Sequence, residues 1–231
     1  MLIGGLLKFS LIDYPGKVAA VVFTQGCNYR CPFCHNPQLV LPELFTEPIA
    51  MDEVLGFLEK RRGQLQGVVI TGGEPTLHEG LKDFIRRVKA MGYLVKLDTN
   101  GSRPEVLRAI LDEKMVDLVA MDVKASPAGY AKATGARCDL DSVRASIALI
   151  KESGVDHVFR TTAVKGFLMP EDVAAVRILL GRVRRYKLQR GNISGNILDW
   201  SLLDGPADLS DEEWARLNKA LEANISVDSQ S

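Results

Sequence analysis

The sequence lacks the features that mark membrane, secreted and polyanion-binding proteins. None of its 231 residues belong to an uninterrupted apolar run of the roughly eighteen residues that a membrane span needs. The N-terminus lacks a basic leader and a small-residue cleavage site. Lys and Arg together number 29, as do Asp and Glu, so the zero net charge offers no field to attract polyanions. We therefore expect a soluble cytoplasmic protein that binds neither nucleic acid nor a membrane.

Cysteine is also scarce, and its placement is informative. Three of the four cysteines, Cys27, Cys31 and Cys34, lie close together, and only Cys138 lies elsewhere. A disulfide framework would spread its cysteines along the chain. Clustered thiols in a cytosolic chain instead indicate metal binding or redox chemistry.

Short apolar, β-branched runs alternate with longer amphipathic stretches. Strands are expected at Val18–Thr24, Val68–Thr71, Leu94–Asp98, Leu118–Val123, His157–Ala163 and Tyr186–Gln189. Helices are expected between them at Asp52–Arg61, Glu79–Met91, Pro104–Glu113, Asp141–Ser153 and Glu171–Arg184. This alternation predicts an α/β fold with a parallel sheet. Six strand–helix units are fewer than the eight of a TIM barrel of roughly 250 residues, so an incomplete barrel or an open sheet is expected.

Nothing in the sequence marks a second domain, because internal repeats, low-complexity tracts and Pro/Gly/Ser linkers are lacking. We expect one domain over residues 1–223, beginning with an N-terminal extension at 1–17. A last helix is expected at 210–223, where Ser210 and Glu213 form a capping box. Residues 224–231 are polar and are expected to form a flexible tail.

The three clustered cysteines follow the first predicted strand, at the end of a parallel sheet where α/β folds keep their chemistry. Thiolates favour iron–sulfur clusters, zinc or copper. Three ligands leave a tetrahedral or cubane site incomplete, and a structural zinc site completed by His35 or Cys138 is the simplest alternative. Closed zinc sites usually combine two paired-ligand arms, however, and the second arm is missing here.

The spacing C-x3-C-x2-C, with an aromatic residue before the third cysteine, resembles the signature of the radical S-adenosylmethionine superfamily. The resemblance implies that Cys27, Cys31 and Cys34 hold a 4Fe-4S cluster whose open iron is chelated by S-adenosylmethionine. It also implies that Phe33 and His35 lie against the adenine. A packing role for Phe33 is compatible with this contact.

The second predicted strand ends in Thr71-Gly72-Gly73-Glu74-Pro75. Two glycines allow the backbone to approach a ligand closely, and Glu74 can accept from a cation. An ordinary strand-to-helix turn is the alternative. The segment resembles the family's G-G-E-P motif, which implies that Gly72, Gly73 and Glu74 bind the amino group of S-adenosylmethionine.

The third strand ends in Leu97-Asp98-Thr99-Asn100-Gly101 and the fourth in Met121-Asp122-Val123-Lys124. Both carboxylates should emerge at the same edge of the sheet, with helix capping or a salt bridge to Lys124 as the alternative. The two motifs resemble those of the enzymes that activate glycyl-radical enzymes. That resemblance implies a monovalent cation held by Asp98, Thr99 and Asp122, for which hard oxygen ligands are suitable. It places Asn100 in the cofactor site.

Two cations complete the predicted site. Lys124 is expected at the mouth of the active site, as the candidate catalytic residue. Arg160 lies in the middle of the fifth strand, where burial without an anionic partner would be costly. The resemblance implies that Arg160 contacts S-adenosylmethionine.

The segment Ile3–Lys17, together with F-T-Q-G-C-N and C-H-N-P, resembles the anaerobic ribonucleoside-triphosphate reductase activating proteins. The resemblance implies a partial (β/α)6 TIM-like barrel. It also implies an enzyme that reductively cleaves S-adenosylmethionine and uses the 5′-deoxyadenosyl radical to make a glycyl radical on a partner, with a flavodoxin or ferredoxin as electron donor. The sequence departs from this pattern after the last strand, at residues 190–193, which puts the identity of the protein substrate in doubt.

Two other functions remain open. One is a radical S-adenosylmethionine enzyme acting on a small molecule, such as a 7-carboxy-7-deazaguanine synthase, although those usually continue the cysteine loop into C-D-T. The other is a zinc or iron–sulfur module that mediates an interaction. Additional ferredoxin-like clusters would need eight more thiols, so Cys138 is expected to be a bystander.

A basic run spans Arg182–Lys187 and continues at Arg190. A solvated helix end is the simpler interpretation, because cations favour helix C-termini. A docking surface for an acidic partner is the alternative.

Overall fold

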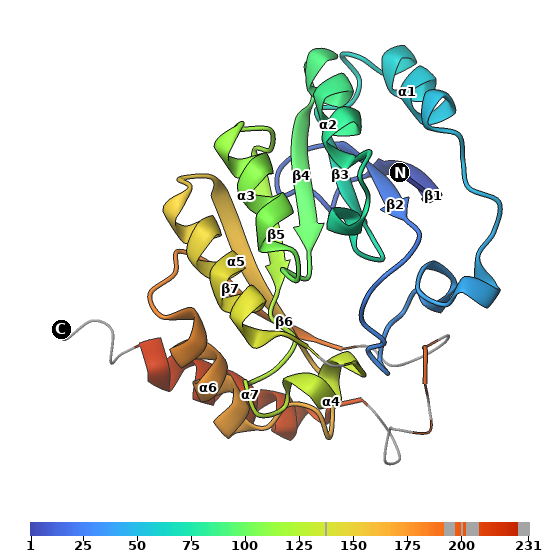
Figure 1. The fold of residues 1–231 in the computed structure, drawn as a ribbon. Helices are drawn as coiled ribbons and strands as arrows, with labels where there is room; N and C mark the ends of the chain where they lie inside the picture. The colour runs from blue at the N-terminus through green and yellow to red at the C-terminus, as the bar shows by residue number, and fades with distance from the viewer. Residues whose placement is uncertain (137, 192–196, 200, 202–207, 226–231) are drawn as a thin grey trace.

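The computed structural model describes residues 1–136, 138–191, 197–199, 201 and 208–225, and these form one curved sheet covered by helices (Figure 1). The sheet has the order β1-β2-β3-β4-β5-β6-β7, identical to the order along the chain. Strands β2 to β7 are parallel, and β1 pairs antiparallel with β2. The strands are β1 Ile3–Ser10, β2 Ala19–Thr24, β3 Gly67–Gly72, β4 Leu94–Thr99, β5 Leu118–Asp122, β6 Asp156–Ala163 and β7 Tyr186–Arg190.

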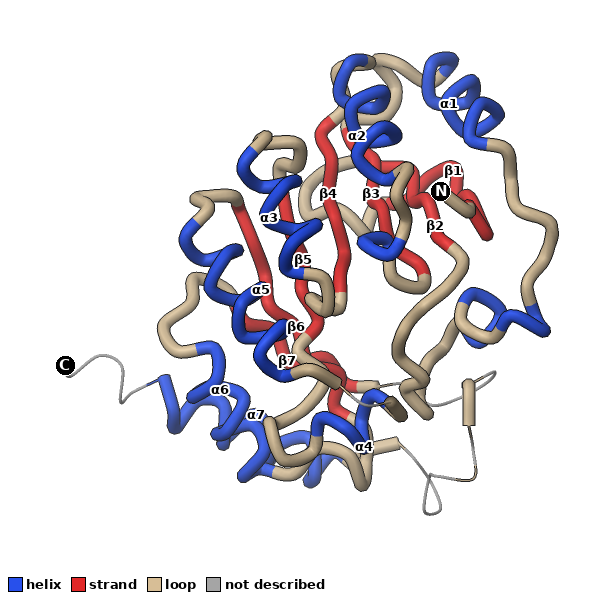
Figure 2. Tube along the Cα trace, viewed as in Figure 1, coloured by secondary structure: helices blue, strands red, loops and turns tan. Residues whose placement is uncertain are grey.

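Helices connect successive parallel strands, a last helix follows β7, and the helices lie on one side of the sheet (Figure 2). They are α1 Met51–Lys60, α2 Leu81–Ala90, α3 Pro104–Asp112, α4 Tyr130–Thr134, α5 Leu140–Glu152, α6 Pro170–Leu180 and α7 Asp211–Ile225. A doubly wound sheet would reverse its strand order and carry helices on both faces. The unbroken order and the single helical layer therefore confirm a partial TIM-like barrel.

The two faces of the sheet differ in character, as β6 illustrates. His157, Phe159 and Thr161 are buried on the helix side, whereas Val158, Arg160 and Thr162 are only partly buried on the other side. This period of two is that of a strand covered on one face. Among the helix-facing side chains, Phe159 belongs to the main hydrophobic core. The concave face is left free to carry polar groups near the strand ends.

The N-terminal segment is part of the sheet, which the sequence did not predict. The expected N-terminal extension, residues 1–17, contains strand β1. This strand pairs with β2, with Ile3 opposite Thr24 at one end and Ser10 opposite Ala19 at the other. Its G-G-L-L-K-F sequence lacks a clear period of two, because much of the strand is exposed at the sheet edge. The short helix α4 was also not predicted.

The C-terminal part of the chain differs in its boundaries. Helix α6 ends at Leu180 rather than Arg184, because Gly181 takes a φ of 58°. The capping box is present, since Glu213 N donates to Ser210 Oγ at 3.1 Å and Ser210 N donates to Glu213 Oε2 at 2.7 Å. Helix α7 reaches Ile225, and the rest of the expected tail, residues 226–231, lies outside the described residues.

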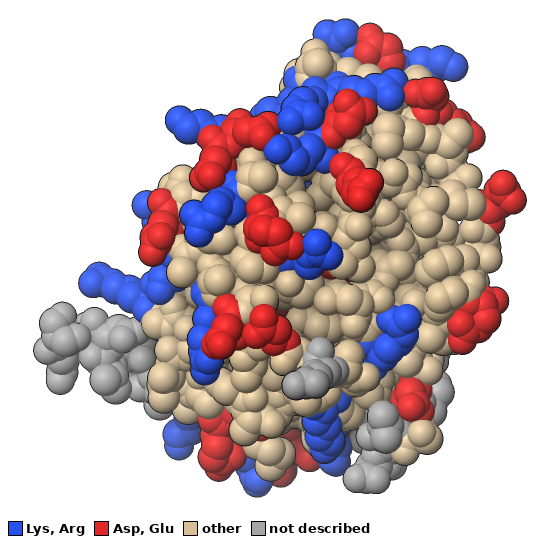
Figure 3. All heavy atoms as spheres, in the orientation of Figure 1, with Lys and Arg blue, Asp and Glu red and all other residues tan. Residues whose placement is uncertain are grey.

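The surface shows both signs of charge side by side on the face in Figure 3, consistent with the zero net charge. Across the described parts of the chain, no helix combines the length and the apolar character that crossing a bilayer would require.

Candidate functional site

A cavity of about 230 Å³ lies where the parallel strands end. It brings together every site residue predicted from the sequence. They are Cys27, Cys31, Phe33, Cys34, His35, Gly72, Gly73, Glu74, Asp98, Thr99, Asn100, Asp122, Lys124 and Arg160. These residues come from the strands β3 to β6 and from the loops that follow β2 to β5, and they converge because the carboxyl ends of parallel strands share one edge.

The cysteine loop is fixed at its base and at its middle by backbone hydrogen bonds. Gly26 N donates to Leu39 O at 2.8 Å, which closes the loop, and Cys34 N donates to Cys31 O at 2.9 Å. Arg30 N donates to Thr134 O at 2.7 Å, which ties the loop to α4. Helix α4 therefore supports the cysteine loop.

The thiols share a buried environment. Burial raises the pKa of Cys27 to about 11 and that of Cys31 to about 12, while the nearby Lys124 ammonium opposes both rises. Cys31 is buried, whereas Cys27 and Cys34 are partly exposed to the cavity. The Cys27 and Cys31 thiols are therefore protonated near neutral pH, and binding a metal centre must displace their protons.

The donor set fits an iron–sulfur cluster better than a single metal ion. Within the described residues, no group of three or more His, Cys, Asp or Glu side chains is placed to hold one ion. A zinc ion needs all its donors within about 2.3 Å of one point. The thiolates of a cubane bind separate irons and can stand further apart. Three cysteines lining one cavity suit the cluster, and the zinc interpretation finds no support.

The glycine pair lies against the base of the cysteine loop. A Cβ on Gly73 would lie 2.0 Å from Gly26 O, and a Cβ on Gly72 would lie 2.3 Å from Thr24 N. Gly73 N donates to Thr24 O at 2.9 Å, and Glu74 N donates to Gly26 O at 2.8 Å. The glycines thus permit close contact between two segments of the chain itself, in addition to any contact with a ligand.

Glu74 is buried and fully engaged by the chain. Its Oε1 accepts from Thr76 N at 3.1 Å, Thr76 Oγ1 at 2.5 Å and Thr99 Oγ1 at 2.7 Å, and its Oε2 accepts from Asn100 N at 2.6 Å. Burial raises the pKa of Glu74, and these four hydrogen bonds oppose the rise. Asn100 Nδ2 in turn donates to Asn28 Oδ1 at 2.9 Å. The Glu74 side chain therefore joins the ends of β3 and β4, and Asn100 links them to the cysteine loop.

The two aspartates belong to a chain of ion pairs on the concave face. Asp98 Oδ1 lies 2.6 Å from Lys96 Nζ, and Asp98 Oδ2 lies 3.2 Å from Arg160 Nη1. Asp122 Oδ1 lies 2.8 Å from Arg160 Nε, and Asp122 Oδ2 lies 3.0 Å from Lys124 Nζ. The anionic partner expected for Arg160 is thus a pair of carboxylates, and the alternative salt bridge between Asp122 and Lys124 is present.

These pairs fix the charge states of the site. Burial alone would raise the pKa of Asp122, but Arg160 and Lys124 hold it well below its usual range. Burial would lower the pKa of Lys124, but Asp122, together with Cys31, holds it above its usual range. Within this chain of ion pairs Lys96, Arg160 and Lys124 neutralise the two carboxylates, and Lys124 and Arg160 also line the cofactor cavity.

Aromatic and polar residues complete the wall of the cavity. Phe33 packs edge-on against Phe167, with ring centroids 5.3 Å apart, and also lines the cavity. The sequence analysis missed several lining residues, namely Tyr29, Asn36, Val40, Thr71 and Thr162. Thr162 could have been found, because it lies two residues after Arg160 on the same face of β6.

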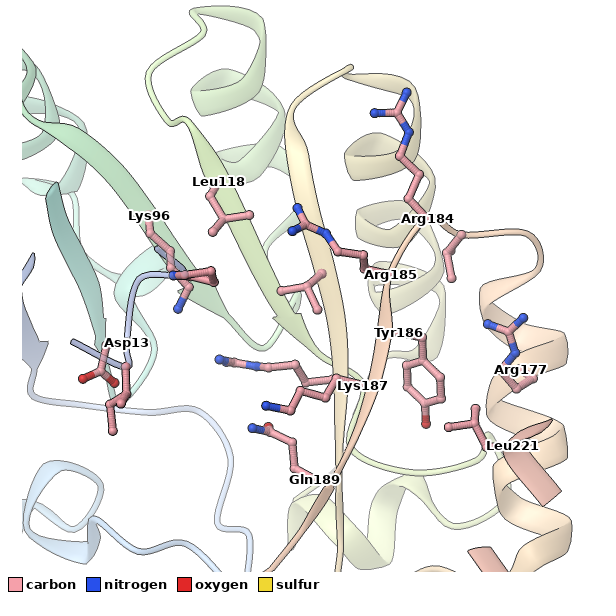
Figure 4. A pocket seen from close by; sticks show the side chains of 15 residues that line it. Asp13, Lys96, Leu118, Arg177, Arg184, Arg185, Tyr186, Lys187, Gln189 and Leu221 are labelled. Atoms are coloured by element: carbon pink, nitrogen blue, oxygen red, sulfur yellow. The ribbon is translucent and has the colours of Figure 1, made fainter. Parts of the chain in front are cut away.

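A second cavity, of about 810 Å³, opens beneath the first on the concave face, and Arg160 lines both. Figure 4 shows Lys96 pointing into it from β4, and Lys187 and Gln189 from β7. Asp13 stands on the opposite side, in the segment that follows β1. The larger cavity therefore lies between the two free edges of the sheet.

The basic run lies before and along β7, so its interpretation as a helix end is wrong. Arg185 pairs with Asp156, and Arg190 Nη1 lies 2.7 Å from Asp211 Oδ1. Arg184, Arg185 and Lys187 of the basic run all line the larger cavity, and Figure 4 shows Lys187 pointing into it. The alternative of a docking surface stays a prediction, and the departure at 190–193 lies largely outside the described residues.

Cys138 lies apart from the other cysteines in the fold. Its Sγ is 3.1 Å from Tyr29 Oη, and it does not line the cavity of the three clustered cysteines. Its assignment as a bystander to the cluster remains a prediction.

Comparison with known proteins identifies relatives for most of the chain. The model of the radical SAM superfamily matches residues 21–177. A provisionally named glycyl-radical enzyme activating enzyme of Methanocaldococcus jannaschii is 31% identical over 221 residues, covering 94% of this chain and 85% of the relative. A pyruvate formate-lyase-activating enzyme of Listeria monocytogenes is 36% identical over 123 residues, 49% of each chain. A 7-carboxy-7-deazaguanine synthase of Methanopyrus kandleri is 34% identical over 131 residues, 48% of this chain and 51% of the relative.

A solved structure shares the fold. SuiB of Streptococcus suis, bound to its precursor peptide SuiA, superposes with a TM-score of 0.70 at 12% sequence identity. The match covers 90% of this chain and 46% of SuiB. The chain thus spans about half the length of SuiB and of the Listeria and Methanopyrus relatives.

Proposed function

The chain belongs to the radical SAM superfamily, and from this membership we propose that it generates a glycyl radical on a partner protein. The observation that carries the proposal is the similarity to the Methanocaldococcus glycyl-radical enzyme activating enzyme, which extends over 94% of this chain. The second half of the chain, including β6 and β7, is thus part of the likeness. Membership in the superfamily implies a 4Fe-4S cluster and S-adenosylmethionine as cofactors.

We propose that Cys27, Cys31 and Cys34 hold the cluster and that Phe33 and His35 lie against the adenine. When bound, the reduced cluster would supply the electron for cleavage of S-adenosylmethionine to methionine and a 5′-deoxyadenosyl radical, the species that would take a hydrogen atom from the partner's glycine. The chain's own residues position the cofactors and exclude water from the radical. No general acid or base is required.

The polar network assigns separate roles to the other residues. Because the Glu74 carboxylate is occupied by Thr76, Thr99 and Asn100, we propose that it positions the strand ends rather than binding S-adenosylmethionine directly. Backbone groups at Gly72 and Gly73 remain candidates for binding the amino group. We propose that Lys124 and Arg160 attract the carboxylate of S-adenosylmethionine, since both line the cavity and carry positive charge.

A monovalent cation cannot bind between Asp98 and Asp122 unless the ion pairs of these two carboxylates rearrange. Each of the four carboxylate oxygens already lies within 3.2 Å of a Lys or Arg nitrogen. A cation would have to displace Arg160, which bridges the two carboxylates. We therefore assign the counter-charge of the site to Lys96, Lys124 and Arg160, and no step depends on a bound cation.

We propose an anaerobic ribonucleoside-triphosphate reductase as the partner and a flavodoxin or ferredoxin as the electron donor. The N-terminal segment and the C-H-N-P sequence support this choice. In the test, reconstituted protein is incubated anaerobically with S-adenosylmethionine, reductant and the purified reductase, and electron paramagnetic resonance is recorded. A doublet that disappears when the partner's radical glycine is changed to alanine supports the proposal. Cleavage of S-adenosylmethionine with a silent partner contradicts it.

A second candidate is an enzyme that acts on a small anionic molecule. The 810 Å³ cavity lies within the size range of small-molecule sites and carries Lys96, Arg160 and Lys187. The similarity to a 7-carboxy-7-deazaguanine synthase also favours it. Formation of 7-carboxy-7-deazaguanine from a small-molecule substrate, with no radical on any protein partner, would support this function over the first.

A further inference from the structure

The concave face of the sheet is open along one side. The seven-stranded order leaves β1 and β7 as its two edges, and the cavity of about 810 Å³ lies between them. Ile12, Asp13 and Pro15, which follow β1, line one side, and Lys187 and Gln189 of β7 line the other. Arg160 lines both this cavity and the cofactor cavity, so the two cavities adjoin at this side chain.

The β1 side of this opening presents large apolar side chains to solvent. Leu11 is 63% exposed and Ile12 is 87% exposed, and both lie in the turn that leads from β1 to the cavity. On β1 itself, Leu7 and Phe9 are 45% and 52% exposed. A contiguous group of exposed apolar residues is uncommon in a protein without a partner at that surface.

The turn holds its apolar side chains outward. Ser10 is buried, and its Oγ accepts hydrogen bonds from Ile12 N and Asp13 N, both at 3.2 Å. Ser10 Oγ also donates to Asp13 Oδ2 at 2.5 Å. These bonds fix the backbone on either side of Ile12. A preorganised apolar projection of this kind loses little conformational freedom when a partner covers it.

We propose that the Leu11–Ile12 turn is the docking element for the protein partner at the open side of the barrel. This inference rests on the proposed function and adds to it the surface by which the partner is recognised. The occupant is a polypeptide that presents an apolar side chain to Leu11 and Ile12 and extends a neighbouring segment past Lys187 toward Arg160. The turn lies at the mouth of the cavity that leads to the cofactors, which favours the substrate protein over an unrelated partner.

The decisive variant is Ile12→Asp, and the chain offers a matched control. Ile178 on α6 is 81% exposed and does not line the larger cavity, so Ile178→Asp introduces the same charge at similar exposure. Neither substitution touches the residues that line the cofactor cavity. Three quantities are measured on reconstituted protein: affinity for the purified anaerobic ribonucleotide reductase, glycyl-radical yield, and 5′-deoxyadenosine formed by dithionite without a partner.

The inference predicts that Ile12→Asp weakens partner affinity at least tenfold and lowers radical yield at subsaturating partner. Partner-independent formation of 5′-deoxyadenosine should stay within twofold of the wild type, and Ile178→Asp should match the wild type in all three assays. Equal partner affinity of Ile12→Asp and wild type would overturn the inference while leaving the proposed function intact. A change from dimer to monomer on Ile12→Asp, seen by light scattering, would also overturn it by making the turn a self-association surface. If the wild type forms no radical on the reductase yet cleaves S-adenosylmethionine, the proposed function fails and this inference fails with it.

Discussion

Substitution of Gly73 by alanine tests whether the glycine pair serves the fold or the ligand. Gly73 is not among the glycines with a positive φ, so steric contact rather than backbone strain decides the outcome. The new Cβ would lie 2.0 Å from Gly26 O and 2.6 Å from Gly26 C. Both are backbone atoms at the base of the cysteine loop. Because ordinary contact begins at 3.4 Å, the Gly26 carbonyl must move by about 1.4 Å.

That movement breaks the hydrogen bond from Glu74 N to Gly26 O, now 2.8 Å long. Losing one backbone hydrogen bond costs about 1 kcal/mol, and overpacking costs about 1–3 kcal/mol more. We therefore expect Gly73→Ala to destabilise the protein without cofactors by about 2–4 kcal/mol, which corresponds to a fall in Tm of roughly 10 °C for a chain of this size. Iron content after reconstitution should fall as well, because the base of the loop has shifted.

The assay is thermal unfolding of the protein without cofactors, followed by iron analysis after anaerobic reconstitution. Gly56→Ala is the control, since Gly56 lies in α1 and a Cβ there has open space. It should raise stability by about 0.5–1 kcal/mol, as alanine usually does in place of glycine within a helix. If Gly73→Ala keeps the Tm and the iron content of the wild type and loses only affinity for S-adenosylmethionine, the glycine serves the ligand and the steric reasoning is refuted.

Three further tests address other residues of the two cavities and the remaining cysteine. Cys138→Ala should keep the full iron and sulfide content, whereas Cys31→Ala should lose the cluster; a loss of iron in Cys138→Ala would make that residue a ligand. Arg160→Met leaves one oxygen of each neighbouring carboxylate without its cation. The free energy of unfolding, measured in urea, should therefore fall by about 2–4 kcal/mol. Cleavage of S-adenosylmethionine should become dependent on K⁺ or Na⁺. Unchanged stability would show that the ion pairs contribute little. Lys187→Glu should raise the partner concentration needed for half-maximal activation, because within the described residues Lys187 has no ion-pair partner of its own. The control is Lys60→Glu on α1. If Lys187→Glu has no larger effect than this control, the docking interpretation of the basic run is wrong.

The location of the site could be predicted from the sequence, because a parallel sheet brings all its strand ends to one edge. The cysteine loop, the glycine pair and the two aspartates follow or end separate strands, Arg160 lies within the next strand, and the structure places all of them around one cavity. The need of Arg160 for an anionic partner also followed from its place in the middle of a strand, and Asp98 and Asp122 satisfy it.

The tertiary contacts within the site could not be predicted. That Gly73 faces Gly26, and that the Glu74 carboxylate is occupied by Thr76, Thr99 and Asn100, depends on how two loops pack, which local sequence does not encode. Strand β1 was missed for a related reason. It lies at an edge, much of it is exposed, and only its pairing with β2 makes it a strand.

The transfer of hydrogen from a partner glycine is the step that defines the proposed function, and isotope labelling follows it directly. The partner reductase is prepared with glycine deuterated at both α positions and incubated anaerobically with the reconstituted protein, S-adenosylmethionine and reductant. We expect the 5′-deoxyadenosine to gain one deuterium, read by mass spectrometry, in step with the appearance of the glycyl radical. Formation of 5′-deoxyadenosine that carries no deuterium, with a partner that stays free of radical, would contradict the assignment.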